Sequence, residues 1–267
     1  MPLLNNKSIK MKKIFLSILF LFTISTSQLF AQNFFAQIQE VTITEGMSSE
    51  YEEFESFWSV VNEKLIADGH LAGWSFWKVN PTSNDNNPWA DYVLYNLFSS
   101  EEQMKSTLSK SPEWWVEYVE KAHKGKSKRS LIRKYVKETL DNKYKERLVT
   151  YNTSNVAAFA DENLQPAKGM NAVYIGMEQL NEDYERFETE YFQKAHQGNK
   201  MYWEFNKITD RSDNAYKPVT HNIFEVNKEN SGQDQESSFV DEMMAKYGMA
   251  SRTLHGWMVV ELLEFKL

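Results

Sequence analysis

An internal repeat constrains this chain more than any other feature, because its two copies keep four sequence blocks in the same order. The offset between matching blocks falls in small steps, from 133 residues to 129, 126 and 123. The matching blocks begin at Tyr51 and Tyr184, Trp74 and Trp203, Asn96 and Asn222, and Arg129 and Arg252. Since three short deletions align all four blocks, we interpret the chain as one ancestral unit present twice.

Each copy is predicted to contain the elements strand, helix, strand, strand, helix, strand. Alternating and β-rich segments predict the strands, and Ser-initiated segments such as those after Ser49, Ser99 and Ser111 predict helix starts. In the first copy the predicted strands are 35–44, 73–80, 91–98 and 129–140. In the second copy the strands are 170–180, 200–208, 219–226 and 253–265, with helices at 182–196 and 236–247.

The order β-α-β-β-α-β is that of the ferredoxin-like split βαβ unit. A four-stranded sheet covered by helices on one side leaves its other face bare, and two such sheets can bury their bare faces on each other. This arrangement resembles the dimeric α+β barrel superfamily in a tandem fused form, and in particular the antibiotic-biosynthesis-monooxygenase-like proteins. We therefore expect an α+β fold in which two ferredoxin-like repeats pack sheet to sheet as a pseudo-dimeric barrel within one chain. The oligomeric state is left open.

The N-terminal segment is typical of a signal peptide. Lys12 and Lys13 precede a short apolar run over 14–24, and Ala31 supplies a small residue for cleavage. The run is short for a bilayer span, so we expect export to the periplasm or outside, without stable membrane insertion after cleavage. The predicted organisation is a signal peptide over 1–31, repeats over 32–140 and 169–267, and a linker over 141–168 that contains at most a short strand at 147–151.

Composition narrows the classes of function. The chain has no cysteine, which excludes disulfides and cysteine-based metal sites. Loss of residues 1–31 removes four lysines and no acidic residue, so the formal charge moves from −7 to −11. An acidic chain argues against nucleic acid as a partner. Residues 121–147 run against this trend, with eleven Lys or Arg and three Asp or Glu, and form either a solvated surface or an anion-binding face.

The candidate ligand-binding residues lie on predicted strands. A Trp-x-Phe-x-Lys pattern places Trp74 and Lys78 on one strand face, and Trp203 and Lys207 repeat it. Asn96 and Asn222 lie on the following strand of each copy. A polar group in an apolar stripe normally has a partner or a ligand, so faces that point into the barrel would form an aromatic pocket for a small apolar or aromatic molecule. In the alternative structural interpretation, the aromatic residues are core and the lysines lie at strand ends.

The five histidines show no metal-binding spacing. His221 and His255 are predicted on the third and fourth strands of the second copy, roughly 9–10 Å apart across the intervening first strand. Their counterparts in the first copy are Tyr95 and Ile132. We therefore expect an asymmetric site in the second copy, with Trp203 and Asn222 preferred to His221 as lining residues. His255 is a further candidate.

Three hypotheses of function follow. The resemblance implies a cofactor-independent monooxygenase for a polycyclic or quinol-like substrate, with Trp74, Asn96, Trp203 and Asn222 as the residues carried over. The lack of a phosphate loop, nucleophile elbow or catalytic triad favours an exported binding protein without catalysis, for which haem is a possible ligand since some superfamily members bind it. The third hypothesis is a structural protein with a filled barrel. No other cofactor is expected.

Overall fold

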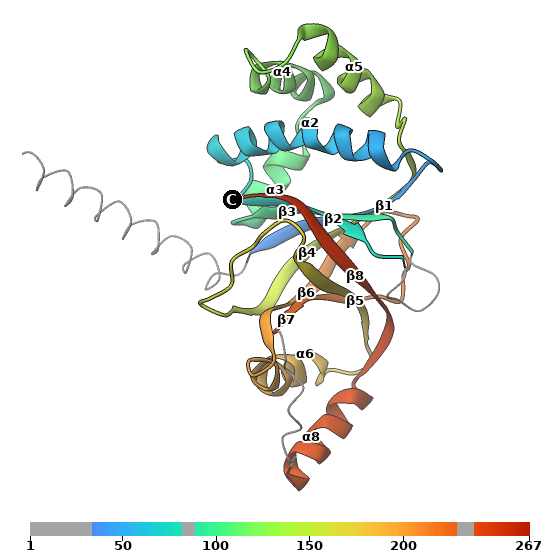
Figure 1. Cartoon of the computed structure of the whole chain (residues 1–267). Helices are drawn as coiled ribbons and strands as arrows, with labels where there is room; N and C mark the ends of the chain where they lie inside the picture. Colours follow the sequence, from blue (N-terminus) through green and yellow to red (C-terminus); the bar gives the residue numbers. More distant parts are fainter. Residues whose placement is uncertain (1–33, 82–88, 229–237) are drawn as a thin grey trace, which may run out of the picture. The chain divides into compact units, whose positions relative to one another are not determined.

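A computed structural model describes residues 34–81, 89–228 and 238–267, so the predicted signal peptide lies outside the described residues. These residues form a closed barrel of antiparallel strands in the order β1-β3-β2-β8-β5-β7-β6-β4 (Figure 1). The strands are β1 (Phe35–Ile43), β2 (Gly73–Val79), β3 (Tyr92–Phe98), β4 (Lys145–Ala160), β5 (Asn171–Gln179), β6 (Lys200–Arg211), β7 (His221–Asn227) and β8 (Arg252–Lys266).

The barrel consists of two four-stranded sheets, each with the strand order of a ferredoxin-like unit. The first copy supplies β4-β1-β3-β2 and the second supplies β8-β5-β7-β6. The pairs β2–β8 and β4–β6 join the two sheets at their edges. The predicted pseudo-dimeric α+β barrel is therefore confirmed, as is the separation of β7 from β8 by β5.

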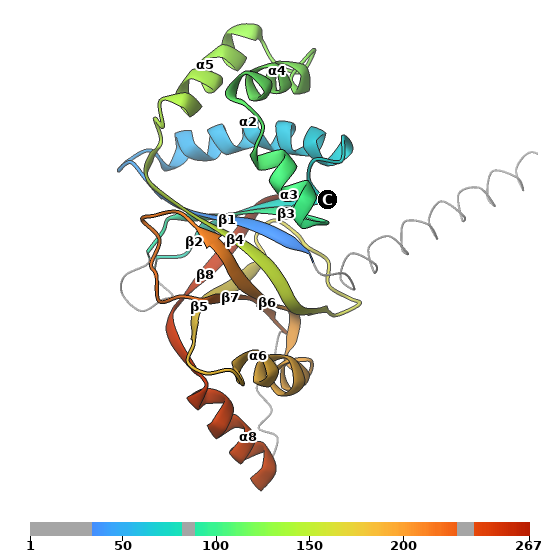
Figure 2. The same cartoon turned by 180° about the vertical axis from the view of Figure 1, so that it is seen from behind.

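The helices cover the outer faces of the two sheets unequally. In the first copy α2 and α3 lie against the sheet with α4 and α5 beyond α2, and the second copy has a shorter set at the opposite end (Figures 1 and 2). The helices are α2 (Ser48–Ala67), α3 (Glu101–Leu108), α4 (Pro112–Ala122), α5 (Arg129–Leu140), α6 (Tyr184–Phe187), α7 (Gln193–His196) and α8 (Phe239–Ala250), with a π-helical turn at Glu188–Phe192 between α6 and α7.

Helix starts and ends follow local sequence signals. Ser111 caps α4 by accepting a hydrogen bond from the backbone of Trp114, and Pro112 occupies the first turn, where its missing N–H costs nothing. Gly69 ends α2 with φ of +78°, a left-handed conformation that a residue without a side chain adopts readily. These helices place aromatic residues against the sheet.

The fourth strand of the first copy is not at 129–140, as the repeat predicted. That segment is helix α5, and the strand is β4, which occupies much of the segment 141–168 predicted as a linker. The buried residues of α5 are Ile132, Tyr135 and Glu138, and their spacing of three is typical of one helix face. The segment that begins at Arg129 was matched to the one at Arg252 by residue identity, without regard to the helical spacing of its apolar residues.

The core is divided between the barrel interior and the two helix-covered faces. Trp74 and Phe76 lie in the cluster under the first copy's helices, and Trp203 and Phe205 lie in the cluster under the second copy's helices. Their predicted burial is confirmed, with exposures of 2% or less. The sequence left open which face points into the barrel, and the interior cluster is formed by residues such as Tyr95 and Phe224 on the other face.

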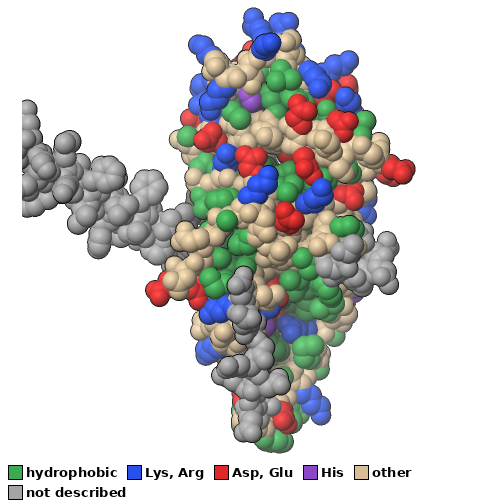
Figure 3. Space-filling view, viewed as in Figure 1, with side chains coloured by type: hydrophobic (Ala, Val, Ile, Leu, Met, Phe, Trp, Pro, Cys, Tyr) green, Lys and Arg blue, Asp and Glu red, His purple; other side chains and the backbone are tan. Residues whose placement is uncertain are grey.

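Basic side chains gather at the end of the molecule formed by α4 and α5 (Figure 3). Lys124, Lys128, Arg133 and Lys137 are all exposed there, which is compatible with both interpretations of the basic segment. Within the described residues, no helix has the length and apolar character needed to cross a bilayer.

Candidate functional site

A cavity of about 220 Å³ lies between the sheet of the first copy and its helices. Its walls are mostly aromatic or aliphatic and come from β2, β3, α2 and α4. They include Trp58, Leu65, Trp74, Leu94, Phe98 and Trp115. Burial of an apolar ligand against such a lining is favourable, and a few polar groups then determine which ligand binds.

Three side-chain amides from neighbouring strands lie together in the polar part of this cavity, to which Asn62 of α2 also contributes. Gln37 and Gln39 project from β1, and Asn96 from β3 faces Gln37 in the strand register. Gln39 donates a hydrogen bond to Gln37 at 3.0 Å, and Asn96 Nδ2 lies 3.4 Å from Gln37 Oε1. Because the latter contact is long, the Asn96 amide retains capacity to bond a ligand.

Trp74 and Asn96 are brought together as the sequence predicted, although on the helix-covered face. They are directly opposite each other across the β2–β3 ladder. Trp74 is 2% exposed, and both side chains line the cavity. An aromatic ring beside an amide suits a planar ligand that also carries a hydrogen-bonding group.

A buried carboxyl group completes the cavity. Glu55 on α2 is 3% exposed, and its Oε1 lies 3.9 Å from Lys145 Nζ at the start of β4. Burial raises the pKa of Glu55, and the charge of Lys145 opposes this shift. A carboxyl with a raised pKa beside an apolar cavity can accept or donate a proton in a reaction there.

The corresponding face of the second copy lacks the amides. The strand registers place Val173 opposite Glu225, and Glu225 opposite Trp203, so these residues correspond to Gln37, Asn96 and Trp74. Trp203 is fully buried and packs on Phe159 and Phe205. The amide-lined site is therefore a feature of the helix-covered face of the first copy, and the equivalent face of the second copy does not share it.

The predicted pairing of Trp203 with Asn222 in one cavity is wrong. Trp203 shares its sheet face with His221, which stacks on Phe205 at 4.9 Å. Asn222 points into the barrel, where its Oδ1 accepts a hydrogen bond from Asn206 at 3.0 Å. Asn206 also donates to Glu204 at 2.9 Å, so Asn222 belongs to a buried polar network. The alignment at offset 126 paired Asn222 with Asn96, and the register shows that Glu225 is the structural counterpart.

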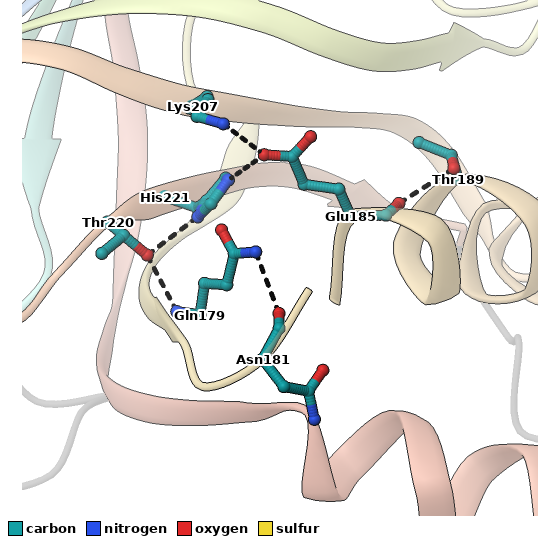
Figure 4. Close-up of polar contacts among 7 residues, drawn as sticks. All are labelled: Gln179, Asn181, Glu185, Thr189, Lys207, Thr220 and His221. Atoms are coloured by element: carbon teal, nitrogen blue, oxygen red, sulfur yellow. Dashed lines mark hydrogen bonds and ion pairs between the residues drawn. The ribbon is translucent and has the colours of Figure 1, made fainter. Parts of the chain in front are cut away.

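Lys78 and Lys207 bond to helices. Lys78 Nζ lies 2.8 Å from Glu52, and Lys207 Nζ lies 2.7 Å from Glu185. Figure 4 shows Lys207 and His221 converging on Glu185, with His221 Nε2 at 3.4 Å. In the first copy the hydroxyl of Tyr92 replaces this histidine and donates to Glu52 at 2.8 Å. A direct ligand-binding role of the two lysines stays a prediction.

His255 lines a different cavity, of about 600 Å³, at one mouth of the barrel. Its Nε2 lies 2.7 Å from Glu178 and its Nδ1 lies 3.4 Å from the hydroxyl of Tyr216. Glu178 engages Nε2 closely, whereas the contact of Nδ1 with Tyr216 is long. His221 is fully buried between Thr220 and Glu185. Each histidine already has a carboxylate partner, and a role of either one as a haem ligand stays a prediction.

Gln37, Gln39 and Glu55 were not singled out from the sequence. A signal was present for Glu55, because it lies beside Phe54 on the apolar side of an amphipathic helix, where an unpaired charge is rare. The two glutamines alternate with Ala36 and Ile38 and therefore look like the solvent face of a strand. Only the position of the helices shows that this face is covered.

Comparison with known proteins finds similarity in structure alone. No protein-family model and no curated protein sequence matches the chain. A candidate monooxygenase from Fusobacterium nucleatum superposes with a TM-score of 0.55 at 8% identity, covering 88% of this chain and 94% of that one. An anthrone oxidase-like protein gives a TM-score of 0.50 at 8% identity, covering 88% and 93%. A candidate chlorite dismutase gives a TM-score of 0.45 at 8% identity, covering 87% of this chain and 96% of that one.

These likenesses define a class of fold. The chain is a fused dimeric α+β barrel protein, built from two ferredoxin-like repeats like the solved proteins that it resembles. At such low identity the likeness shows the fold, and the function is argued from the site.

Proposed function

We propose that this protein is exported and binds a small planar aromatic molecule with hydroxyl or carbonyl groups between the sheet and helices of the first copy. One observation carries the proposal: Trp74 and Asn96 face each other in a cavity that also exposes two glutamine amides. The aromatic walls favour a flat ring, and the amides can donate to and accept from its oxygen atoms.

The size of the cavity limits the ligand. Its volume of about 220 Å³ lies below the roughly 300–1,000 Å³ of drug-sized pockets, so one or two fused rings suit it better than a tetracycle. Export rests on the charge and apolar pattern of residues 1–31, and N-terminal sequencing of the protein recovered from the producing cells tests it.

Titration with 2-naphthol, followed by tryptophan fluorescence, tests the binding proposal. We expect saturable binding, and Asn96→Ala should weaken it about tenfold, since one hydrogen bond contributes about 1–1.5 kcal/mol. Asn171→Ala, at an exposed strand end, is the matched control and should bind as the wild type does. Absence of saturation by 2-naphthol and by matched naphthoquinones, or equal affinity in the two variants, would contradict the proposal.

A second candidate function is cofactor-independent oxygenation of such a ligand. Glu55 favours it, because loss of the hydroxyl proton activates a quinol toward oxygen and a buried carboxylate beside the cavity can accept that proton. Oxygen uptake with 1,4-naphthohydroquinone, corrected for autoxidation, tests it. We expect a rate proportional to enzyme concentration that Glu55→Gln lowers about 100-fold or more. An unchanged rate in this variant leaves binding as the function.

A further inference from the structure

The barrel-mouth cavity is separate from the proposed site and has its own polar anchor. It lies on the interior side of the sheets, whereas the amide-lined cavity lies under the helices. Trp89, Tyr151 and Tyr174 supply aromatic walls, and Glu40 of β1 supplies a carboxyl group. Glu40 is 4% exposed, and both tyrosines are 3% exposed, so these three side chains are shielded from bulk water.

Glu40 has neutral hydrogen-bond donors but no close cation. The Tyr174 hydroxyl donates to its Oε1 at 3.1 Å, and Trp89 also bonds to the carboxyl. Among the described residues Glu40 forms no ion pair, and the charge of Arg147 opposes the effect of burial on its pKa less than either hydrogen bond does. A buried carboxylate without a counter-ion is costly, and burial raises the pKa of Glu40 to about 7.

Two glycines shape the floor of this cavity. Gly176 of β5 pairs with Gly256 of β8. A Cβ at Gly256 would lie 2.8 Å from the ring of Trp89, and a Cβ at Gly176 would lie 3.2 Å from Val219. Side chains here would displace the aromatic wall. The register makes Gly176 the counterpart of Glu40, so the carboxyl is present in one copy and absent in the other.

The basic side chains at the rim already have hydrogen-bond partners. Arg147 donates to the carbonyl of Trp89 at 2.6 Å, and Lys217 donates to the carbonyl of Ser212 at 3.2 Å. His255 is paired with Glu178. Among the described lining residues Glu40 is thus the one carboxyl group, it forms no ion pair, and it is enclosed by aromatic faces that attract cations.

We propose that the barrel-mouth cavity binds a small organic ammonium ion with an aromatic or apolar body, its charge paired with Glu40. The ammonium supplies the missing counter-ion, and its body fills the aromatic part of the cavity. The volume of about 600 Å³ accommodates a single-ring amine with ordered water. This site is independent of the proposed function and can exist whether or not the amide-lined cavity is occupied.

Calorimetric titration with phenethylamine, 2-phenylethanol and phenylacetate at pH 7.5 tests the proposal, since the three probes share a ring and differ in charge. We expect phenethylamine to bind at least tenfold more tightly than the other two. Glu40→Gln should weaken amine binding at least tenfold. Glu204→Gln is the matched control, because it removes another buried interior carboxyl that does not line the cavity, and it should leave amine binding unchanged.

A second variant keeps the test valid if Glu40→Gln folds poorly. Ala215 is buried in the lining, so Ala215→Leu fills the cavity and should abolish amine binding with Glu40 intact. Asn96→Ala should leave it unchanged, which separates this site from the proposed function. No amine binding up to 10 mM, equal binding in Glu40→Gln, or tighter binding of the alcohol or acid would overturn the proposal.

Discussion

Lys207 donates a hydrogen bond to Glu185 at 2.7 Å, and the same contact occurs in the first copy between Lys78 and Glu52 at 2.8 Å. In both copies the contact joins the second strand to the first long helix. It has survived divergence that removed most other identities between the repeats. The repeated lysine therefore marks a helix–sheet contact of the ancestral unit.

Lys78→Met is expected to have little effect on either stability or binding. The lysine and glutamate side chains are 44% and 36% exposed, and ion pairs of this kind contribute roughly 0–1 kcal/mol. Urea unfolding should show a loss below about 1 kcal/mol, with unchanged affinity for 2-naphthol. A tenfold loss of affinity would instead restore Lys78 as a ligand-binding residue.

Trp203→Ala should destabilise the protein by roughly 3–5 kcal/mol, because it removes a fully buried ring and leaves a cavity under the second copy's helices. Urea unfolding measures this loss. Binding of 2-naphthol at a temperature where the variant is folded should be unchanged, since the first copy holds the amides. A loss below 1 kcal/mol would show that the second helical layer adjusts freely around this residue.

The fold could be predicted because its signals are local and repeated. Alternation, helix starts and the order of blocks locate seven of the eight strands within a few residues. The eighth failed because Arg129–Leu140 was assigned by likeness to Arg252 rather than by its helical period. The fourth strand of the first copy is β4, which contains 16 residues of mixed polarity. Such a sequence predicts a linker, and only the pairing with β1 and β6 shows that it is a strand.

The site was less predictable because it depends on register. A shift of one residue moves a side chain to the other face of a sheet, and this separates Asn222 from Trp203. Trp74 and Asn96 lie on one face as expected, but the sequence does not show which face the helices cover. Gln37 becomes a site residue only when α2 and α4 lie over it.

The stability of the barrel interior should depend on pH through Glu204. Burial raises the pKa of Glu204 to about 7 from a normal value of 4.5, so the folded protein favours its protonated form. Its contribution is therefore fully present below pH 4.5 and is lost as the pH rises through 7. Glu204→Gln lacks this titration, so its free energy of unfolding relative to the wild type should rise by up to about 3 kcal/mol between pH 5 and pH 8. Parallel pH profiles of the two proteins would contradict this.

Gly248→Ala tests how closely α8 packs. Alanine stabilises a helix interior by about 1 kcal/mol relative to glycine. However, a Cβ at Gly248 would lie 2.6 Å from the ring of Phe192 and 3.2 Å from Phe187. Overpacking costs about 1–3 kcal/mol, so we expect a net loss of up to about 2 kcal/mol on thermal or urea unfolding. A stabilised variant would show that the helix moves away without cost.

Glu55 and Glu188 occupy equivalent positions, each one turn after an equivalent tyrosine, and provide a matched pair of variants. Glu188 is fully buried and bonds directly to Arg252, whereas Glu55 lines the cavity with Lys145 at 3.9 Å. Glu188→Gln leaves the guanidinium without its partner and should cost roughly 3–5 kcal/mol of stability, with 2-naphthol affinity unchanged. Glu55→Gln should lose less stability and weaken 2-naphthol binding about tenfold, because the amide is a poorer acceptor for a phenolic proton. Urea unfolding and fluorescence titration of both variants measure the two effects. The reverse assignment, with binding lost in Glu188→Gln and kept in Glu55→Gln, would place the ligand in the second copy.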